Sequence, residues 1–139
     1  MQMDAAMITG DAAVARYTGP IPSAGLGAGT STCVYADTSN NTGTGNTVVT
    51  VVEPVTGSVD APILEAAVAA VARSSSGTAY TNVPGLGDLG LARVSDTEAD
   101  FAFAKRSTVV VIVATSPAKA GADMLSAEET VARTLVAEL

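Results

Sequence analysis

Histidine and tryptophan are absent from this chain of 139 residues, and it has a single cysteine, Cys33. Without an imidazole the chain cannot build a Ser-His-Asp triad or a Cys-His pair, because both use histidine as the base near neutral pH. Zinc sites made of histidine and clustered cysteine are excluded as well, and one cysteine cannot form an intramolecular disulfide. Cys33 falls in an expected strand, where we interpret it as a buried, unreactive thiol. These absences exclude the commonest templates of nucleophilic catalysis and zinc binding.

Positive charge and long hydrophobic runs are also scarce. The sequence has 7 Lys and Arg against 14 Asp and Glu, a formal net charge of −7, and its basic residues are scattered. We therefore expect no nucleic-acid partner and no attraction to anionic membrane surfaces. The longest strongly apolar run, residues 109–114, is far too short to span a bilayer. The N-terminus lacks the basic and apolar parts of a signal peptide, so we expect a cytoplasmic protein, or an extracytoplasmic one if an export segment has been removed.

The chain is 47% hydrophobic and has a length that one hydrophobic core can stabilise. We expect one domain over residues 1–139, with residues 1–8 disordered or foreign to it. Caps, β-branched runs and glycine or proline breaks predict helices over 9–17, from 60 and from 126, and strands over 30–36, 47–53, 90–94, 100–105 and 108–115. The order α-β-β-α-β-β-β-α with short links favours an α+β fold, an antiparallel sheet of four or five strands with helices packed mainly on one face.

Individual residues mark the ends of helices and the centre of the sheet. Asp60 can cap the second helix, and Ser126 with Glu129 fits a capping box for the last one. The second helix should place one apolar face on the sheet, formed by Ile63, Leu64, Ala67, Val68 and Val71. The unbroken β-branched run at 108–115 predicts a central strand that is covered on both faces.

Three acidic residues, Asp96, Glu98 and Asp100, occupy alternate positions. In an extended chain their carboxylates would project from one side, an arrangement that can hold a hard cation such as calcium. The rest of the calcium-loop pattern is missing, since Phe101 stands where glycine is required and Ser107 where a bidentate glutamate is required. We therefore expect the three acids to be solvated near a hairpin or to protect a sheet edge, with a metal site as the weaker alternative. No cofactor is expected.

The string Val-Pro-Gly-Leu-Gly-Asp at residues 83–88 is the most distinctive in the chain. Its proline and two glycines predict a loop of defined shape. We interpret this loop as a connector that docks Leu86 into the core, with the wall of a binding site as the alternative. In that alternative Leu86 and Asp88 would join Tyr35 and Tyr80 in contacting a ligand.

The order of these features resembles a known type of protein. The Cys33-Val34-Tyr35 strand with its hairpin, the following helix, the 83–88 string, a strand pair and a final helix are similar to small extracytoplasmic domains of uncharacterised proteins from high-GC bacteria, often lipoproteins. The resemblance covers most of the chain. It implies an exported, non-enzymatic domain of the cell envelope and carries over no catalytic residue. Two features of the pattern are missing, a lipobox before Cys33 and a second cysteine.

The sequence therefore favours a non-catalytic binding or interaction module, of the bacterial cell envelope if the resemblance holds. Its partner would be a protein or a small molecule, and an oligomer is compatible with the sequence. The alternative is a small enzyme or small-molecule-binding protein whose site lies between the sheet and the loops at 20–29 and 83–90. There, carboxylates such as Asp88, with Tyr35 or Tyr80, would carry out acid-base chemistry without imidazole. A concave pocket lined by these loops would favour this alternative, and a flat apolar patch would favour a protein partner.

Overall fold

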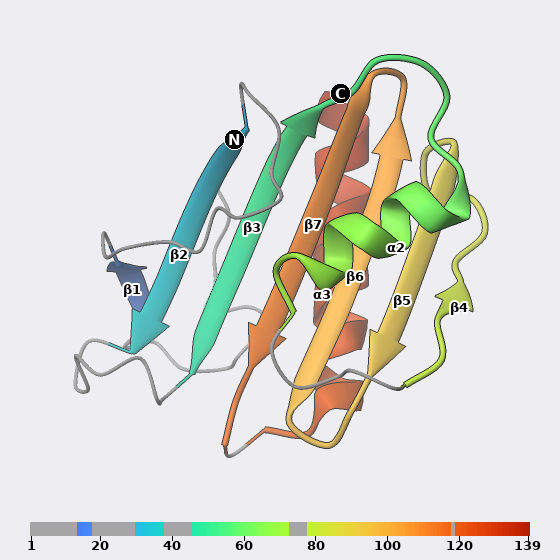
Figure 1. Ribbon diagram of the computed structural model, residues 1–139. Coiled ribbons are helices and arrows are strands. Elements are labelled where there is room, and N and C mark those ends of the chain that lie inside the picture. The colour runs from blue at the N-terminus through green and yellow to red at the C-terminus, as the bar shows by residue number, and fades with distance from the viewer. Residues whose placement is uncertain (1–13, 18–29, 38–45, 73–77, 118) are drawn as a thin grey trace.

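The computed structural model describes residues 14–17, 30–37, 46–72, 78–117 and 119–139 (Figure 1). In these residues the fold is α+β and consists of one antiparallel sheet and two helices. The strands are β1 (Val14–Tyr17), β2 (Ser31–Asp37), β3 (Thr47–Pro54), β4 (Thr81–Asn82), β5 (Leu89–Val94), β6 (Glu98–Lys105) and β7 (Thr108–Thr115). The helices are α2 (Ala61–Ala69) and α3 (Gly121–Glu138).

The sheet has the strand order β1-β2-β3-β7-β6-β5-β4, and every neighbouring pair is antiparallel. Two runs of hairpins, one before α2 and one after it, are joined where β3 pairs with β7 along its whole length, from Thr47 opposite Thr115 to Pro54 opposite Thr108. This pairing confirms that β7 is a central strand. It brings the N-terminal hairpin and the C-terminal half of the chain into one sheet.

The two helices lie on opposite faces of the sheet, which corrects the expectation that they pack mainly on one face. Figure 1 shows α2 in front of the sheet and α3 behind it. Alternate residues of β7 enter two separate cores, with Val110 and Ile112 under α3 and Val111 and Val113 under α2. An apolar strand with no polar alternation needs cover on both sides, and one helix on each face supplies it.

The sheet is wider than the four or five strands expected, and the first helix predicted over 9–17 is wrong where it can be compared. Residues 14–17 form β1, which pairs antiparallel with β2 from Val14 opposite Asp37 to Tyr17 opposite Val34. Residues 9–13 lie outside the described part. The two-residue β4 also extends the sheet, on its other edge. Pairing with β2 overrides the local helix signals of residues 14–17, because tertiary context outweighs local propensity. Spacing along the sequence does not show which strands will pair.

Helix α2 begins as the sequence predicts. Asp60 is its N-cap, and the carboxylate accepts a hydrogen bond from the Ile63 backbone N–H at 3.1 Å. Leu64 and Val68 are buried against the sheet. Ile63 is 46% exposed, so its expected place on the buried face is wrong. It belongs to the first turn, where the cap directs its backbone and the side chain points outward.

Helix α3 begins at Gly121, well before the predicted start at Ser126, and the capping box is not its N-terminus. Its N-cap, Ala120, makes no side-chain hydrogen bond. The start is instead set by close packing on the turn between β5 and β6, where the Gly121 N–H donates to the Asp96 carbonyl at 3.0 Å. A Cβ on Gly121 would lie 2.0 Å from the Ser95 carbonyl oxygen, so only glycine fits there.

Candidate functional site

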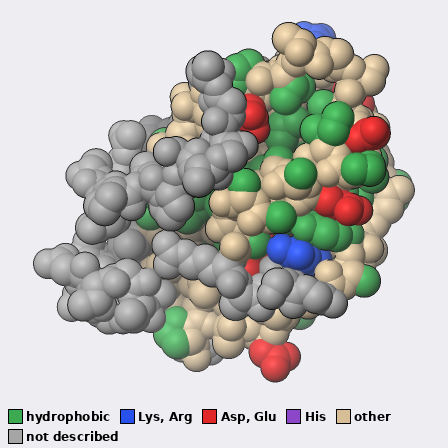
Figure 2. Space-filling model, viewed as in Figure 1, with side chains coloured by type: hydrophobic (Ala, Val, Ile, Leu, Met, Phe, Trp, Pro, Cys, Tyr) green, Lys and Arg blue, Asp and Glu red, His purple; other side chains and the backbone are tan. Residues whose placement is uncertain are grey.

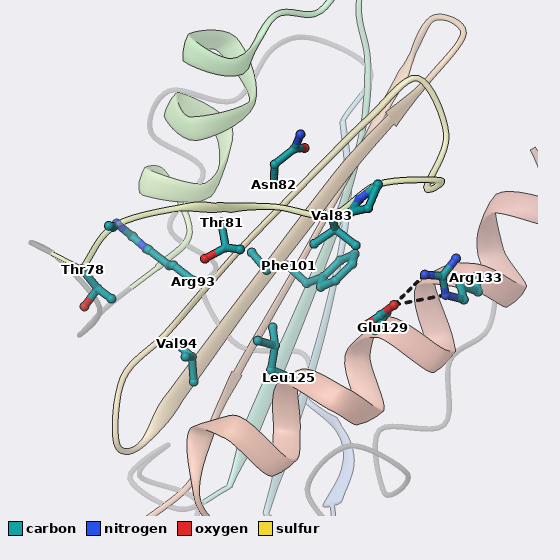
Figure 3. Close-up of a pocket in the computed structure, with 13 residues that line it drawn as sticks. Thr78, Thr81, Asn82, Val83, Arg93, Val94, Phe101, Leu125, Glu129 and Arg133 are labelled. Atoms are coloured by element: carbon teal, nitrogen blue, oxygen red, sulfur yellow. Dashed lines mark hydrogen bonds and ion pairs between the residues drawn. The ribbon is translucent and has the colours of Figure 1, made fainter.

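A groove of about 580 Å³ runs along the β4 edge of the sheet, on the face that α3 covers. One side is formed by β4 and the segments next to it, the floor by β5 and β6, and the other side by α3 (Figure 3). Its lining residues are Thr78, Ala79, Thr81, Asn82, Val83, Pro84, Ala92, Arg93, Val94, Phe101, Leu125, Glu129 and Arg133.

The floor of the groove is apolar. Phe101 is almost completely buried and belongs to the core between the sheet and α3. Figure 3 shows Phe101 and Val83 side by side near the centre of the groove, with Leu125 rising from α3 toward them. Since β4 and β5 are paired with Thr81 opposite Ala92, the small alanine side chain leaves room above the floor. A ligand with an apolar body would therefore find a hydrophobic surface here.

A charged pair forms the α3 rim of the groove. Arg133 Nη2 lies 2.6 Å from Glu129 Oε1, one helical turn away, and these side chains are 50% and 41% exposed. Figure 3 shows both pointing along the helix at the side of the groove. An exposed pair at this spacing is weak, about 0.3–0.5 kcal/mol. A ligand group of either charge can thus compete for one of its members.

Arg93 borders the groove, but its guanidinium is engaged on the α2 side of the sheet. Its Nε lies 2.7 Å from Asp100 Oδ2, and both residues are buried. The guanidinium carbon stands 4.6 Å from the centre of the Tyr80 ring, a cation–π geometry. The Tyr80 hydroxyl in turn donates to the Glu65 carbonyl of α2 at 3.3 Å. In Figure 3 Arg93 extends away from Phe101, toward Thr78.

The environment of Tyr80 opposes ionisation of its hydroxyl. Burial raises the pKa of Tyr80 above its ordinary value, and the nearby Arg93 charge offsets part of that rise. The carboxylates of Asp100 and Glu65 raise it further. At neutral pH the hydroxyl therefore stays protonated and acts as a hydrogen-bond donor, not as a base.

The structure does not bring together the four residues proposed as a ligand site. Tyr35 packs against the core under α3, whereas Tyr80 packs against the core under α2. Leu86 is 2% exposed and lies in the α3 core, as the connector interpretation of the 83–88 loop requires. Asp88 is exposed, and its Oδ2 accepts a hydrogen bond from the Arg106 backbone N–H at 2.7 Å. None of the four lines the groove, and the loop at 20–29 lies outside the described residues.

Asp96, Glu98 and Asp100 have different surroundings, and their expected solvated position is wrong for two of them. Asp96 is exposed in the β5–β6 turn, but Glu98 and Asp100 are completely buried in β6. Because β6 lies between β5 and β7, the acids do not protect a sheet edge either. In the parts of the chain that the structure describes, no group of three or more Asp, Glu or Cys residues is arranged to hold a metal ion.

Sequence reasoning missed the residues that form the α3 wall of the groove. Leu125, Glu129 and Arg133 recur every four residues, so they share one side of a helix. That spacing was a usable signal. The predicted helix start at Ser126 leaves Leu125 outside the helix, so the prediction does not contain this wall.

Charged side chains are scattered over the described part of the face that α2 covers. There, Figure 2 shows acidic and basic side chains separated by hydrophobic and uncharged ones. Within the described part of the chain, no helix is both long and apolar enough to cross a bilayer.

No protein-family model matches the sequence, and no curated protein is significantly similar to it.

Proposed function

We propose that this protein is a non-catalytic binding module and that the groove between β4, β5 and α3 is its binding site. The observation that carries the proposal is the apolar floor around Phe101 beside the exposed Glu129–Arg133 pair. Small-ligand sites usually have volumes of about 300–1,000 Å³, an apolar lining and a few polar groups. The groove, at about 580 Å³, has these properties.

The chemistry of the lining supports binding over catalysis. Catalysis without histidine needs a carboxylate or another group free to exchange a proton with the substrate. The carboxylate that lines the groove, Glu129, lies exposed on the α3 rim and not at the apolar floor around Phe101, and Arg93 is paired with the buried Asp100. The remaining polar lining residues are threonines and Asn82, which orient ligands through hydrogen bonds. The alternative of a small enzyme built on Asp88, Tyr35 and Tyr80 has no support in their placement.

The shape of the site favours a small ligand or a short extended segment with an apolar body and one charged end. The apolar part would lie over Phe101 and Leu125, and the charged end would reach Glu129 or Arg133. A groove of about 580 Å³ suits a compact ligand better than a large flat partner. The location in the bacterial cell envelope, which the family resemblance implies, stays a prediction.

Titration with anilinonaphthalene sulfonate, a probe with an apolar body and one anionic group, tests the proposal. Fluorescence would measure affinity and amide chemical shifts would map the site. Binding should be saturable, with the largest shifts at β4, β5 and the middle of α3. Replacing Thr81, an exposed lining residue, by Trp should fill the groove and weaken binding by about tenfold or more, which corresponds to about 1.4 kcal/mol.

Thr134→Trp is the matched control, because Thr134 is an exposed α3 residue outside the groove. It should leave the affinity unchanged. The proposal is rejected if the probe does not bind the folded protein, or if Thr81→Trp and Thr134→Trp bind it as tightly as the wild type does.

A further inference from the structure

One ionisable group in the described structure is buried without a partner. Glu128 lies on the side of α3 that packs on the sheet, next to Met124, Val131 and Ala132, and its exposure is 0%. Neither of its carboxyl oxygens makes a well-formed hydrogen bond with any described residue, and its one favourable polar neighbour is the backbone of Ala114 in β7. Burying a charge in such a place is costly, so the carboxyl has a strong preference for its neutral form.

The charged groups around Glu128 do not offset this cost. Helix α3 packs on β5, β6 and β7, whose only charged residues are Arg93, Glu98, Asp100 and Lys105. Arg93 is already held by Asp100, and Lys105 donates to the Val136 carbonyl near the other end of α3. Glu98 and Asp100 are themselves buried acids. Both cations on these strands are therefore engaged elsewhere, and the buried carboxylates of Asp100 and Glu98 would repel an ionised Glu128.

The pKa of Glu128 reflects these surroundings. Burial raises it well above the ordinary value of a glutamate, Asp100 and Glu98 raise it further, and the backbone of Ala114 in β7 partly offsets the rise. The unfolded chain has no such environment. Between the unfolded pKa and the raised folded pKa, the folded chain therefore binds more protons at this site than the unfolded chain does.

We propose that Glu128 is a proton-operated latch on α3. While its carboxyl is neutral the helix stays packed on the sheet, and ionisation of that carboxyl loosens the helix. Leu125, Glu129 and Arg133 are on the same helix, so loosening it also displaces one wall of the groove. This last consequence, proton control of ligand binding, rests on the function proposed above, whereas the latch itself does not.

The sign of the pH dependence follows from the direction of the shift. A group whose pKa is raised in the folded state stabilises the fold fully below its unfolded pKa, and that contribution is lost as the pH rises through the folded pKa. Between these two values, a one-proton difference increases the unfolding constant by about tenfold per pH unit. The protein should be most stable in mildly acidic solution and become less stable as the solution becomes alkaline.

Urea unfolding of the wild type, Glu128→Gln, Glu128→Met and Glu138→Gln between about pH 5 and pH 9 tests the latch. The wild type should lose stability as the pH rises. Glu128→Gln keeps the shape of the side chain but not its titration, so the loss attributable to this group should vanish. Glu128→Met serves the same purpose if the buried amide prevents folding. Glu138→Gln changes an exposed acid on the same helix and should keep the wild-type slope.

Amide exchange separates a local latch from a general effect. The opening constants of α3 should rise with pH in the wild type more than those of α2, and this difference should disappear in Glu128→Gln. The latch is overturned if Glu128→Gln and Glu128→Met retain the wild-type slope, or if α2 and α3 open alike. In the wild type alone, the affinity for anilinonaphthalene sulfonate should also fall as the pH rises. If the probe fails to bind at any pH, the proposed function is rejected while the unfolding series still decides the latch.

Discussion

Arg93 and Asp100 stand directly opposite each other on β5 and β6, with Arg93 Nε 2.7 Å from Asp100 Oδ2. Their side chains are 8% and 0% exposed, so the pair is withdrawn from water. The Tyr80 ring covers the guanidinium from the α2 side. The pair therefore links β5, which forms part of the groove floor, to the core on the α2 side of the sheet. It also holds Arg93, beside the groove, in one position.

Replacing Asp100 by Asn should destabilise the protein by about 3–5 kcal/mol, because it leaves the buried guanidinium of Arg93 without a counter-charge. Urea unfolding measures the loss. The control is Glu129→Gln, which breaks the exposed pair with Arg133 and should cost only about 0.3–0.5 kcal/mol. Equal losses of unfolding free energy in the two variants would show that burial does not increase the contribution of Asp100 to stability.

The two glycines of the 83–88 loop should respond differently to alanine. Gly85 and Gly87 have φ of +74° and +61°, so an alanine at either costs about 1–2 kcal/mol in the backbone alone. At Gly87 the new Cβ would also lie 2.3 Å from the Ala104 carbonyl oxygen, whereas at Gly85 it would meet no atom within 4 Å. Thermal unfolding should therefore rank Gly87→Ala well below Gly85→Ala in stability. The reverse order would contradict the connector role of this loop.

A charge in the centre of the sheet should prevent folding. Ile112 is 0% exposed in β7, and an aspartate there would be buried away from water. The cost is comparable with the whole stability of a small domain, about 5–15 kcal/mol. Ile112→Asp should lack native circular dichroism at room temperature. Ile63→Asp makes the same change at a side chain that is 46% exposed, and it should fold and melt near the wild type.

Asp88 should have a measurable structural role at the tip of the β6–β7 hairpin. Arg106 has φ of +54°, and its N–H donates to the Asp88 carboxylate at 2.7 Å. Asp88→Ala removes this acceptor and should cost about 1 kcal/mol in urea unfolding. Asp96→Ala, at an exposed acid in another turn, should change stability by less than about 0.5 kcal/mol. If Asp88→Ala instead abolished probe binding without any loss of stability, Asp88 would be a ligand contact and not a structural residue.

The sequence by itself determined those features whose cause is local. Asp60 caps α2 because its side chain reaches an N–H three residues ahead. The β-branched run of β7 is buried on both faces because it has no polar side to expose to water. Leu86 enters the core because its loop is shaped by its own proline and glycines. The absence of histidine excludes the common catalytic templates that use imidazole as a base, whatever the fold.

The tertiary structure alone decided the features that depend on residues distant in sequence. Residues 14–17 became a strand because β2 offers them hydrogen bonds, and α3 starts at Gly121 because the β5–β6 turn accepts its close approach. The two helices pack on opposite faces of the sheet, and the periodicity of a helix does not indicate which face it will cover. The acids of β6 and Glu128 are buried because sheet pairing and helix packing placed them there, one beside Arg93. Burial and charge pairing are properties of the packed chain, so spacing along the sequence cannot reveal them.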